Sequence, residues 1–183
     1  MRQLLQLLAY QVGSEVSSEE LARNLAMSRN TVERYLDLLS KVFVLFRLGS
    51  YSKNLRNELV KSNKWFFYDN GVRNAVIGDF RPIDVRPDVG ALWENYLISE
   101  RLKMNNNLAL HNRYFFWRTY QRKEIDLIEE SEPGRLSAFE FKWGAKKPAA
   151  PDDFVKGYPD ATFTVVGREN YFNEFLNPNN IIR

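Results

Sequence analysis

Apolar side chains repeat at helical spacing at the start of the chain and gather into short strand-like runs further on. The repeats predict helices over residues 1–10, from Ser17 to about Leu25, and after Ser28 to about Leu39. Ser17 with Glu20 is a capping box, which marks the start of the second helix. Two apolar runs, at 42–46 and 65–68, predict strands on either side of a polar, basic stretch.

The second half of the chain changes its pattern. It predicts a long helix, three consecutive strands, a short helix, a fourth strand and a last helical turn, over residues 88–104, 114–117, 124–129, 136–143, 151–158, 162–166 and 173–176. Between the halves, residues 78–87 hold two prolines and mixed charges, which is typical of a linker. We therefore predict an α+β protein with two domains, at 1–78 and 79–183.

Three helices followed by a two-stranded ribbon with a basic tip is the order of a winged helix-turn-helix. Its recognition helix would present Arg29, Asn30 and Arg34, which suit DNA. The wing would add cations able to neutralise phosphates: Lys53, Arg56, Lys61 and Lys64. Glu33 and Asp37 on the same helix would repel phosphates. The pattern is therefore compatible with DNA contact and equally with docking onto another protein domain.

Acidic residues fall at three places in the second predicted domain: Glu94 on the long helix, then Glu124-Ile125-Asp126, then Glu140-Phe141-Lys142. Because side chains alternate across a strand, Glu124 shares a face with Asp126, and Glu140 shares a face with Lys142. Carboxylates beside a lysine suit a hard divalent cation and a phosphodiester. Charge on a solvated strand face is also common without any function. In that case Glu140 and Lys142 are a surface pair worth roughly 0–1 kcal/mol.

The order helix, three strands, helix, strand, with these acidic positions, resembles the PD-(D/E)xK nuclease-like fold, a restriction-endonuclease-like α/β domain. The matching residues are Glu94, Asp126 and Glu140-Phe141-Lys142, whereas the proline of the family name is absent. The resemblance implies that Asp126 and Glu140 bind Mg²⁺ or Mn²⁺, with Glu94 bound through water or a second ion. It implies that Lys142 orients or helps deprotonate the attacking water. Catalysis would then rest on these four residues.

End to end, the chain resembles the C-terminal region of a bacterial and archaeal group of AAA+-type ATPases, in which a domain of unknown function follows the ATPase core. The resemblance rests on short motifs in sequence order: residues 28–36 (SRNTVERYL), 67–71 (FYDNG), 90–95 (GALWEN), 117–118 (WR) and the acidic motifs. The nucleotide-binding pattern G-x-x-x-x-G-K-S/T of such ATPases does not occur. The chain alone is therefore not expected to hydrolyse ATP, and we expect an ATPase domain or partner beside it.

Composition further limits the kinds of site and the compartment that the sequence allows. The 183 residues carry a formal net charge of +3, and the pI is near 9.1, which is compatible with nucleic-acid contact. The chain has no cysteine, which excludes disulfides and thiolate zinc sites, and its single histidine, His111, argues against histidine-based catalysis. The N-terminal apolar run is too short and too polar to span a membrane, and no cleavage site follows it. We therefore expect a cytoplasmic protein.

Two functions fit these observations. The first is a DNA-associated module of an AAA+-type ATPase with a nuclease-like domain, for which Mg²⁺-dependent phosphodiester hydrolysis is the candidate activity. The second is a catalytically inactive adaptor that couples an ATPase to DNA or to a protein client. A sequence-specific transcription regulator is a third option, but the sequence has no recognisable effector or dimer site.

Overall fold

The computed structural model describes residues 1–52 and 63–180. Contacts between residues divide this part of the chain into two units. Unit 1 contains residues 1–49 and 63–99, and unit 2 contains residues 50–52 and 100–180. The division falls inside a long helix, after Ser99, whereas the predicted boundary at 78/79 lies in the connection before that helix.

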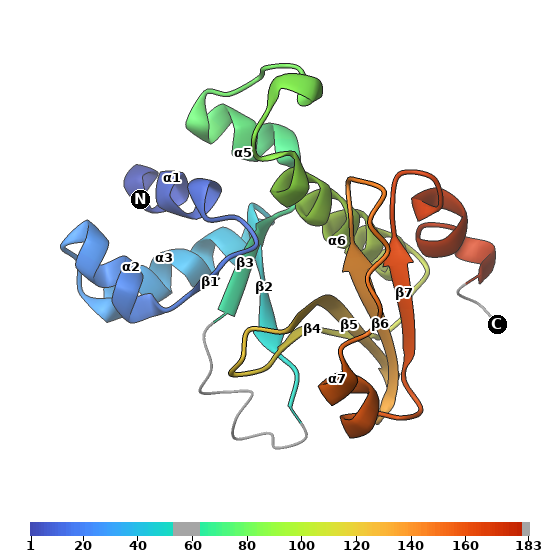
Figure 1. Cartoon of the computed structure of the whole chain (residues 1–183). Coiled ribbons are helices and arrows are strands. Elements are labelled where there is room, and N and C mark those ends of the chain that lie inside the picture. The colour runs from blue at the N-terminus through green and yellow to red at the C-terminus, as the bar shows by residue number, and fades with distance from the viewer. Residues whose placement is uncertain (53–62, 181–183) are drawn as a thin grey trace. The chain divides into compact units, whose positions relative to one another are not determined.

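Unit 1 consists of helices and three short strands in the described residues. Its elements are α1 (Arg2–Tyr10), β1 (Glu15–Val16), α2 (Ser18–Leu25), α3 (Arg29–Lys41), β2 (Leu45–Ser50), β3 (Asn63–Phe67), α5 (Asn70–Ile77), the 3-10 turn η1 (Ile83–Val85) and the first part of α6 (Val89–Asn107). β3 pairs antiparallel with β1 on one side and with β2 on the other. α1 packs against α2 and α5, and Figure 1 shows α1, α2 and α3 in blue beside these strands.

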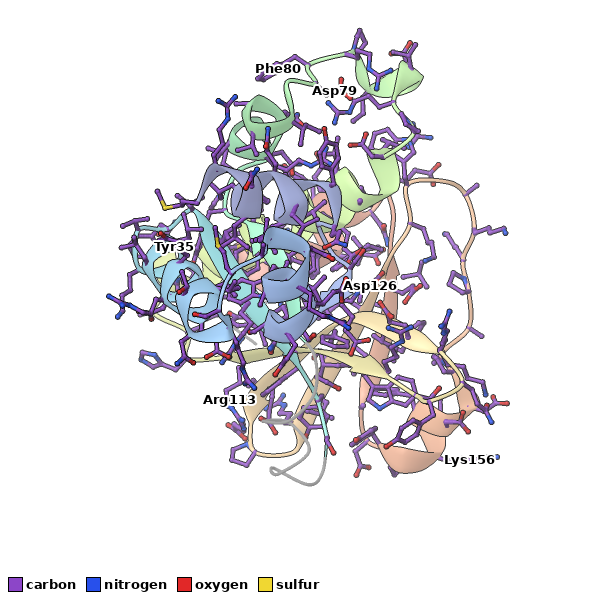
Figure 2. The ribbon with its side chains drawn as sticks, turned by 90° about the vertical axis from the view of Figure 1, so that its left-hand side faces the viewer. Tyr35, Asp79, Phe80, Arg113, Asp126 and Lys156 are labelled. Carbon is purple, nitrogen blue, oxygen red and sulfur yellow. The ribbon has the colours of Figure 1, made fainter. Side chains whose placement is uncertain are left out.

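The predicted helix starts in unit 1 are confirmed. The Ser17 hydroxyl accepts the backbone N–H of Glu20 at 3.1 Å and begins α2, and the Ser28 hydroxyl accepts that of Thr31 at 3.1 Å and begins α3. Both helices bury one apolar stripe, as their spacing predicts: Leu21, Ala22, Val32, Leu36 and Leu39. Tyr35, which follows Val32 at helical spacing and is labelled in Figure 2, is only partly buried.

The strand predicted over 42–46 begins later, because α3 extends to Lys41 and ends in a left-handed turn. Phe43 has φ +56°, and the amide of Val44 donates to the carbonyl of Leu39 at 3.0 Å. The helix end therefore uses the residues that the apolar run assigned to a strand. β1 was not predicted, since two residues are too few to show alternation.

Unit 2 follows the predicted order of elements. After α6 come β4 (Arg113–Arg118), β5 (Glu124–Glu132), β6 (Arg135–Phe141), α7 (Asp152–Gly157), β7 (Thr162–Val166), the π-helical turn η2 (Tyr171–Phe175) and the 3-10 turn η3 (Pro178–Asn180). The strands lie in the order β4-β5-β6-β7. The first two pairings are antiparallel, and β6 and β7 are parallel. The described chain is thus a mixed α/β protein, as Figure 1 shows.

Both faces of the unit 2 sheet are packed. On one face Trp117 meets Phe154 of α7 edge-on, with ring centroids 5.2 Å apart. On the other face Phe139 and Phe141 contact Phe175 of η2, with centroid distances of 4.8 and 5.2 Å. The remaining core residues of the first face are Ile125, Ile128, Leu136 and Ala138. The candidate site residues of β5 and β6 are therefore carried on strands that are held from both sides.

Candidate functional site

Asp126 and Glu140 lie beside each other on neighbouring strands. The register pairs Leu127 of β5 with Phe139 of β6, so Asp126 and Glu140 are the next opposed positions and share a face. The backbone N–H of Phe141 donates to Asp126 Oδ2 at 2.7 Å, which orients the carboxylate. Figure 2 labels Asp126 on β5. Two residues of the predicted metal site are therefore brought together by strand pairing.

Lys142 joins this pair from the end of β6. Its ammonium donates to Glu140 Oε1 at 2.5 Å, and the side chains of Lys142 and Glu140 are 35% and 14% exposed. The face shared by Glu140 and Lys142 is thus confirmed. Glu124 lies two residues before Asp126 on β5. Its Oε2 is 3.6 Å from Nε of Arg118 on β4. Each acidic residue of this face has a positive or N–H group beside it.

The chemistry of the donors fits a hard cation. Asp126 and Glu140 offer carboxylate oxygens, which Mg²⁺ and Mn²⁺ prefer. Within residues 1–52 and 63–180, no three or more histidine, cysteine, aspartate or glutamate side chains are grouped to hold a metal ion. Mg²⁺ commonly takes one or two carboxylates and completes its shell with waters and substrate phosphates. The neighbouring carboxylates of Asp126 and Glu140 match a Mg²⁺ site of this kind, in which only two protein carboxylates bind the ion.

Glu94, the third predicted metal ligand, belongs to unit 1. Its Oε1 lies 3.3 Å from the ammonium of Lys64, and the side chains of Glu94 and Lys64 are 17% and 3% exposed. A Cβ added at Gly13 would come within 3.3 Å of both carboxylate oxygens, and Gly13 has φ +74°. Glycine is therefore favoured there for its backbone conformation and for the space that Glu94 needs.

Lys64, which the sequence assigned to the wing as a cation for DNA phosphates, is not exposed. Lys64 lies on β3, is buried, and directs its ammonium to Glu94. A buried ammonium needs a counter-charge, because its desolvation costs several kcal/mol. The available signal was its place next to the apolar run 65–67, where a lysine must find an acidic partner. Lys53, Arg56 and Lys61 lie outside the described residues.

The exposed face of α3 carries Arg29, Asn30 and Arg34, as predicted. Arg29 pairs with Glu19, and its Nε donates to Glu33 Oε1 at 2.7 Å. The hydrogen bond with Glu33 raises the pKa of Arg29, and the same bond lowers the pKa of Glu33. The positive charge of Arg29 is therefore balanced by two carboxylates at the start of this helix.

A second ionic cluster of unit 2 was not predicted. Arg101 of α6 donates to Glu129 Oε2 of β5 from Nε at 2.9 Å and from Nη2 at 2.6 Å, and both side chains are buried. Asn105 and Asn112 also donate to Glu129. No local sequence pattern predicts this pair, because Arg101 and Glu129 are 28 residues apart and meet only when α6 packs on the sheet.

Comparison with known proteins gives two family matches. Residues 1–82 match a family model described as a domain of unknown function (DUF8612), and residues 89–173 match a domain of unknown function (DUF4143). No solved structure matches the chain. Across the two described stretches, no helix has the length and the apolar run that crossing a bilayer requires.

Bacterial relatives cover the chain in part. An uncharacterized protein of Mycobacterium tuberculosis and one of Mycobacterium bovis are each 32% identical over 144 residues, which is 78% of this chain. An uncharacterized protein of Haemophilus influenzae is 31% identical over 65 residues, covering 36% of this chain and 16% of its own length. The chain spans about a third of the mycobacterial relatives, 32% of their length. It thus joins segments similar to two domains of unknown function, in an order shared in part with longer, uncharacterized mycobacterial proteins.

Proposed function

We propose that this chain is a DNA-associated module of an AAA+-type ATPase, in which unit 2 is a nuclease-like domain that hydrolyses phosphodiesters with Mg²⁺ or Mn²⁺. The observation that carries the proposal is the meeting of Asp126 of β5, Glu140 of β6 and Lys142, which directly follows β6. Two carboxylates and an ammonium on one face are the groups that a metal ion and a phosphate need.

The topology of each unit supports the proposal. In unit 1 the order α1-β1-α2-α3-β2-β3, with β3 between β1 and β2, is that expected of a winged helix-turn-helix. In unit 2 a helix, the three antiparallel strands β4 to β6, the helix α7 and the parallel strand β7 follow the order of the PD-(D/E)xK fold. Asp126 and Glu140 fall on the second and third strands of that order, where the resemblance expects the metal ligands.

Each residue has a chemical part in the proposed reaction. Asp126, oriented by the N–H of Phe141, and Glu140 would hold the metal ion. When bound, the metal ion would act as a Lewis acid on a phosphoryl oxygen. Lys142 neutralises Glu140 in the protein alone and would offer the same ammonium to the charge that develops on the phosphate.

The link to an ATPase rests on the relatives and on the sequence motifs. The chain spans 32% of the length of its mycobacterial relatives, which leaves room in them for a further domain. DUF4143 domains commonly occur with ATPase-associated domains. We place the module in the cytoplasm, where such an ATPase would meet DNA. In this proposal ATP hydrolysis belongs to the neighbouring domain or partner.

Cleavage assays test the proposal. Purified protein with Mn²⁺ or Mg²⁺ should cut plasmid, linear or branched DNA, and Asp126→Asn and Glu140→Gln should abolish cutting. Glu132→Gln is the matched control, because Glu132 is an exposed glutamate on the same strand as Asp126. Calorimetry should show Mn²⁺ binding that tightens with DNA and disappears in Asp126→Asn. Cutting that persists in Asp126→Asn would point to a contaminating nuclease and sink the proposal.

A second candidate function, the inactive adaptor, is favoured by the position of Glu94. The resemblance gives Glu94 a role at the metal ion, yet its carboxylate pairs with the buried Lys64 inside unit 1, which is what a structural ion pair does. An adaptor would bind DNA or an ATPase domain without cutting. Titration of Mn²⁺ into protein with DNA would then give no heat beyond that of Mn²⁺ titrated into DNA alone, and Asp126→Asn would bind partners as the unchanged protein does.

A further inference from the structure

A pocket opens where β6 and β7 end. These strands are parallel, with Glu140 opposite Val165, so their carboxyl ends meet at the same edge of the sheet. Figure 1 shows their arrowheads side by side, with the red turn η2 next to them. The segments that follow the two strands enclose a volume of about 340 Å³. This lies within the roughly 300–1,000 Å³ range of ligand pockets, and the ends of parallel strands are common binding positions.

Four of the twelve residues that line the pocket are cationic. Lys142, Lys146 and Lys147 come from the segment after β6, and Arg168 comes from the segment after β7. Two acidic residues, Glu169 and Glu174, also line it, so positive charge is in excess. Lys146, Lys147 and Arg168 are exposed, and none makes an ion pair with another described residue. Their charges are therefore available to an anion.

Arg168 is held in place by an aromatic ring. Its guanidinium carbon lies 4.8 Å from the ring centroid of Trp143. The side chain of Asn170 stabilises the loop that carries Arg168. Its Oδ1 accepts the N–H of Gly167 at 2.7 Å, and its Nδ2 donates to the carbonyl of Val165 at 3.0 Å. A guanidinium stacked on an indole keeps its planar fork of donors oriented, and that fork matches the oxygens of a phosphate.

We propose that this pocket binds the phosphate backbone of a nucleic-acid strand and leads it to Asp126 and Glu140. Four cations spread over two segments exceed what one phosphate requires, and they suit consecutive phosphates of a strand. Lys142 joins the pocket to the candidate site, because it lines the pocket and pairs with Glu140. The inference rests on the proposed function in that it names how the substrate is held. Contacts of this kind position a strand without reading its bases.

Binding can be measured separately from cutting. Anisotropy of a labelled oligonucleotide in EDTA, at several salt concentrations, gives the slope of log Kobs against log salt. This slope is about −0.9 per phosphate neutralised on duplex DNA and about −0.7 on single strands. The double variant Lys146→Gln/Lys147→Gln should bind more weakly and flatten the slope by about 2, and Arg168→Gln by about 1. Lys156→Gln, an exposed lysine of α7, is the matched control and should leave the slope unchanged.

Several results would overturn the pocket proposal. One is a double variant that binds as Lys156→Gln does while its circular dichroism melt is normal. Another is full displacement of the oligonucleotide by inorganic phosphate at constant ionic strength, or equal binding of polyglutamate. If the pocket variants lose binding and no condition cuts DNA, the pocket stands and the proposed hydrolysis fails. If Asp126 is required for cutting but the pocket variants bind normally, the proposed hydrolysis stands and the pocket proposal fails.

Discussion

Replacing Arg101 by methionine removes a buried charge and keeps most of the side-chain length. Glu129, whose side chain is 3% exposed, would lose both of its bonds from the guanidinium, at 2.9 and 2.6 Å. The carbonyl of Phe175 would lose a donor, and the ring of Phe139 would lose a cation 5.5 Å from its centroid. We therefore expect unit 2 to become less stable.

The size of the effect follows from the carboxylate that is left behind. Removing one partner of a buried ion pair costs about 3–5 kcal/mol, because the other charge stays desolvated. Asn105 and Asn112 still donate to Glu129, which favours the lower end of this range. Glu129→Gln should cost less, about 1–3 kcal/mol, since Arg101 still donates a hydrogen bond to the carbonyl of Phe175. In the double variant the two costs should overlap by roughly 1–3 kcal/mol.

Urea unfolding at neutral pH, monitored by far-ultraviolet circular dichroism, measures these differences in the free energy of unfolding, and thermal unfolding with the same signal gives the melting temperature. In a chain of this size each kcal/mol shifts the melting temperature by about 2–4 °C, so Arg101→Met should lower it by about 6–20 °C. Lys103→Met is the matched control on the same helix, because Lys103 pairs with Glu100 and their side chains are 40% and 37% exposed. Its cost should stay under about 0.5 kcal/mol. A cost for Arg101→Met as small as that of the control, or strict additivity in the double variant, would refute the reasoning.

Two further predictions concern unit 1. Hydrogen bonds from Arg86, and then from Arg73, lower the pKa of Asp88 to about 2, below its ordinary value of 3.8. The folded state therefore binds this proton less readily than the unfolded state, and about 1–2 kcal/mol of stability is present above pH 4 and lost as the pH falls towards 2. Urea unfolding between pH 2 and 6 should show this acid limb flattened in Asp88→Asn, and parallel curves would contradict it. Glu94→Gln should destabilise unit 1 by about 3–5 kcal/mol, because it leaves the buried Lys64 ammonium facing a neutral amide. Urea unfolding that is unchanged in this variant would refute a structural role for the pair.

Much of the element order could be predicted because it depends on neighbours in the chain. The capping hydroxyls of Ser17 and Ser28 act three residues away, and the turn between β5 and β6 needs only Pro133-Gly134. The alternation that sets Glu140 and Lys142 on one face is likewise local. Errors came where a short apolar run was consistent with two structures, as at Phe43, whose left-handed backbone ends α3.

Local chemistry in the chain thus specified which segments become helices or strands and which acidic residues share a face. Packing between distant segments decided the rest. Lys64 and Glu94 are 30 residues apart, and Arg101 and Glu129 are 28 apart. Arg168 reaches Trp143 because β6 and β7 end at the same edge. Whether a charge is solvated, paired or presented to a ligand depends on desolvation and on the partner that folding sets beside it, and neither is a property of neighbouring residues in the chain.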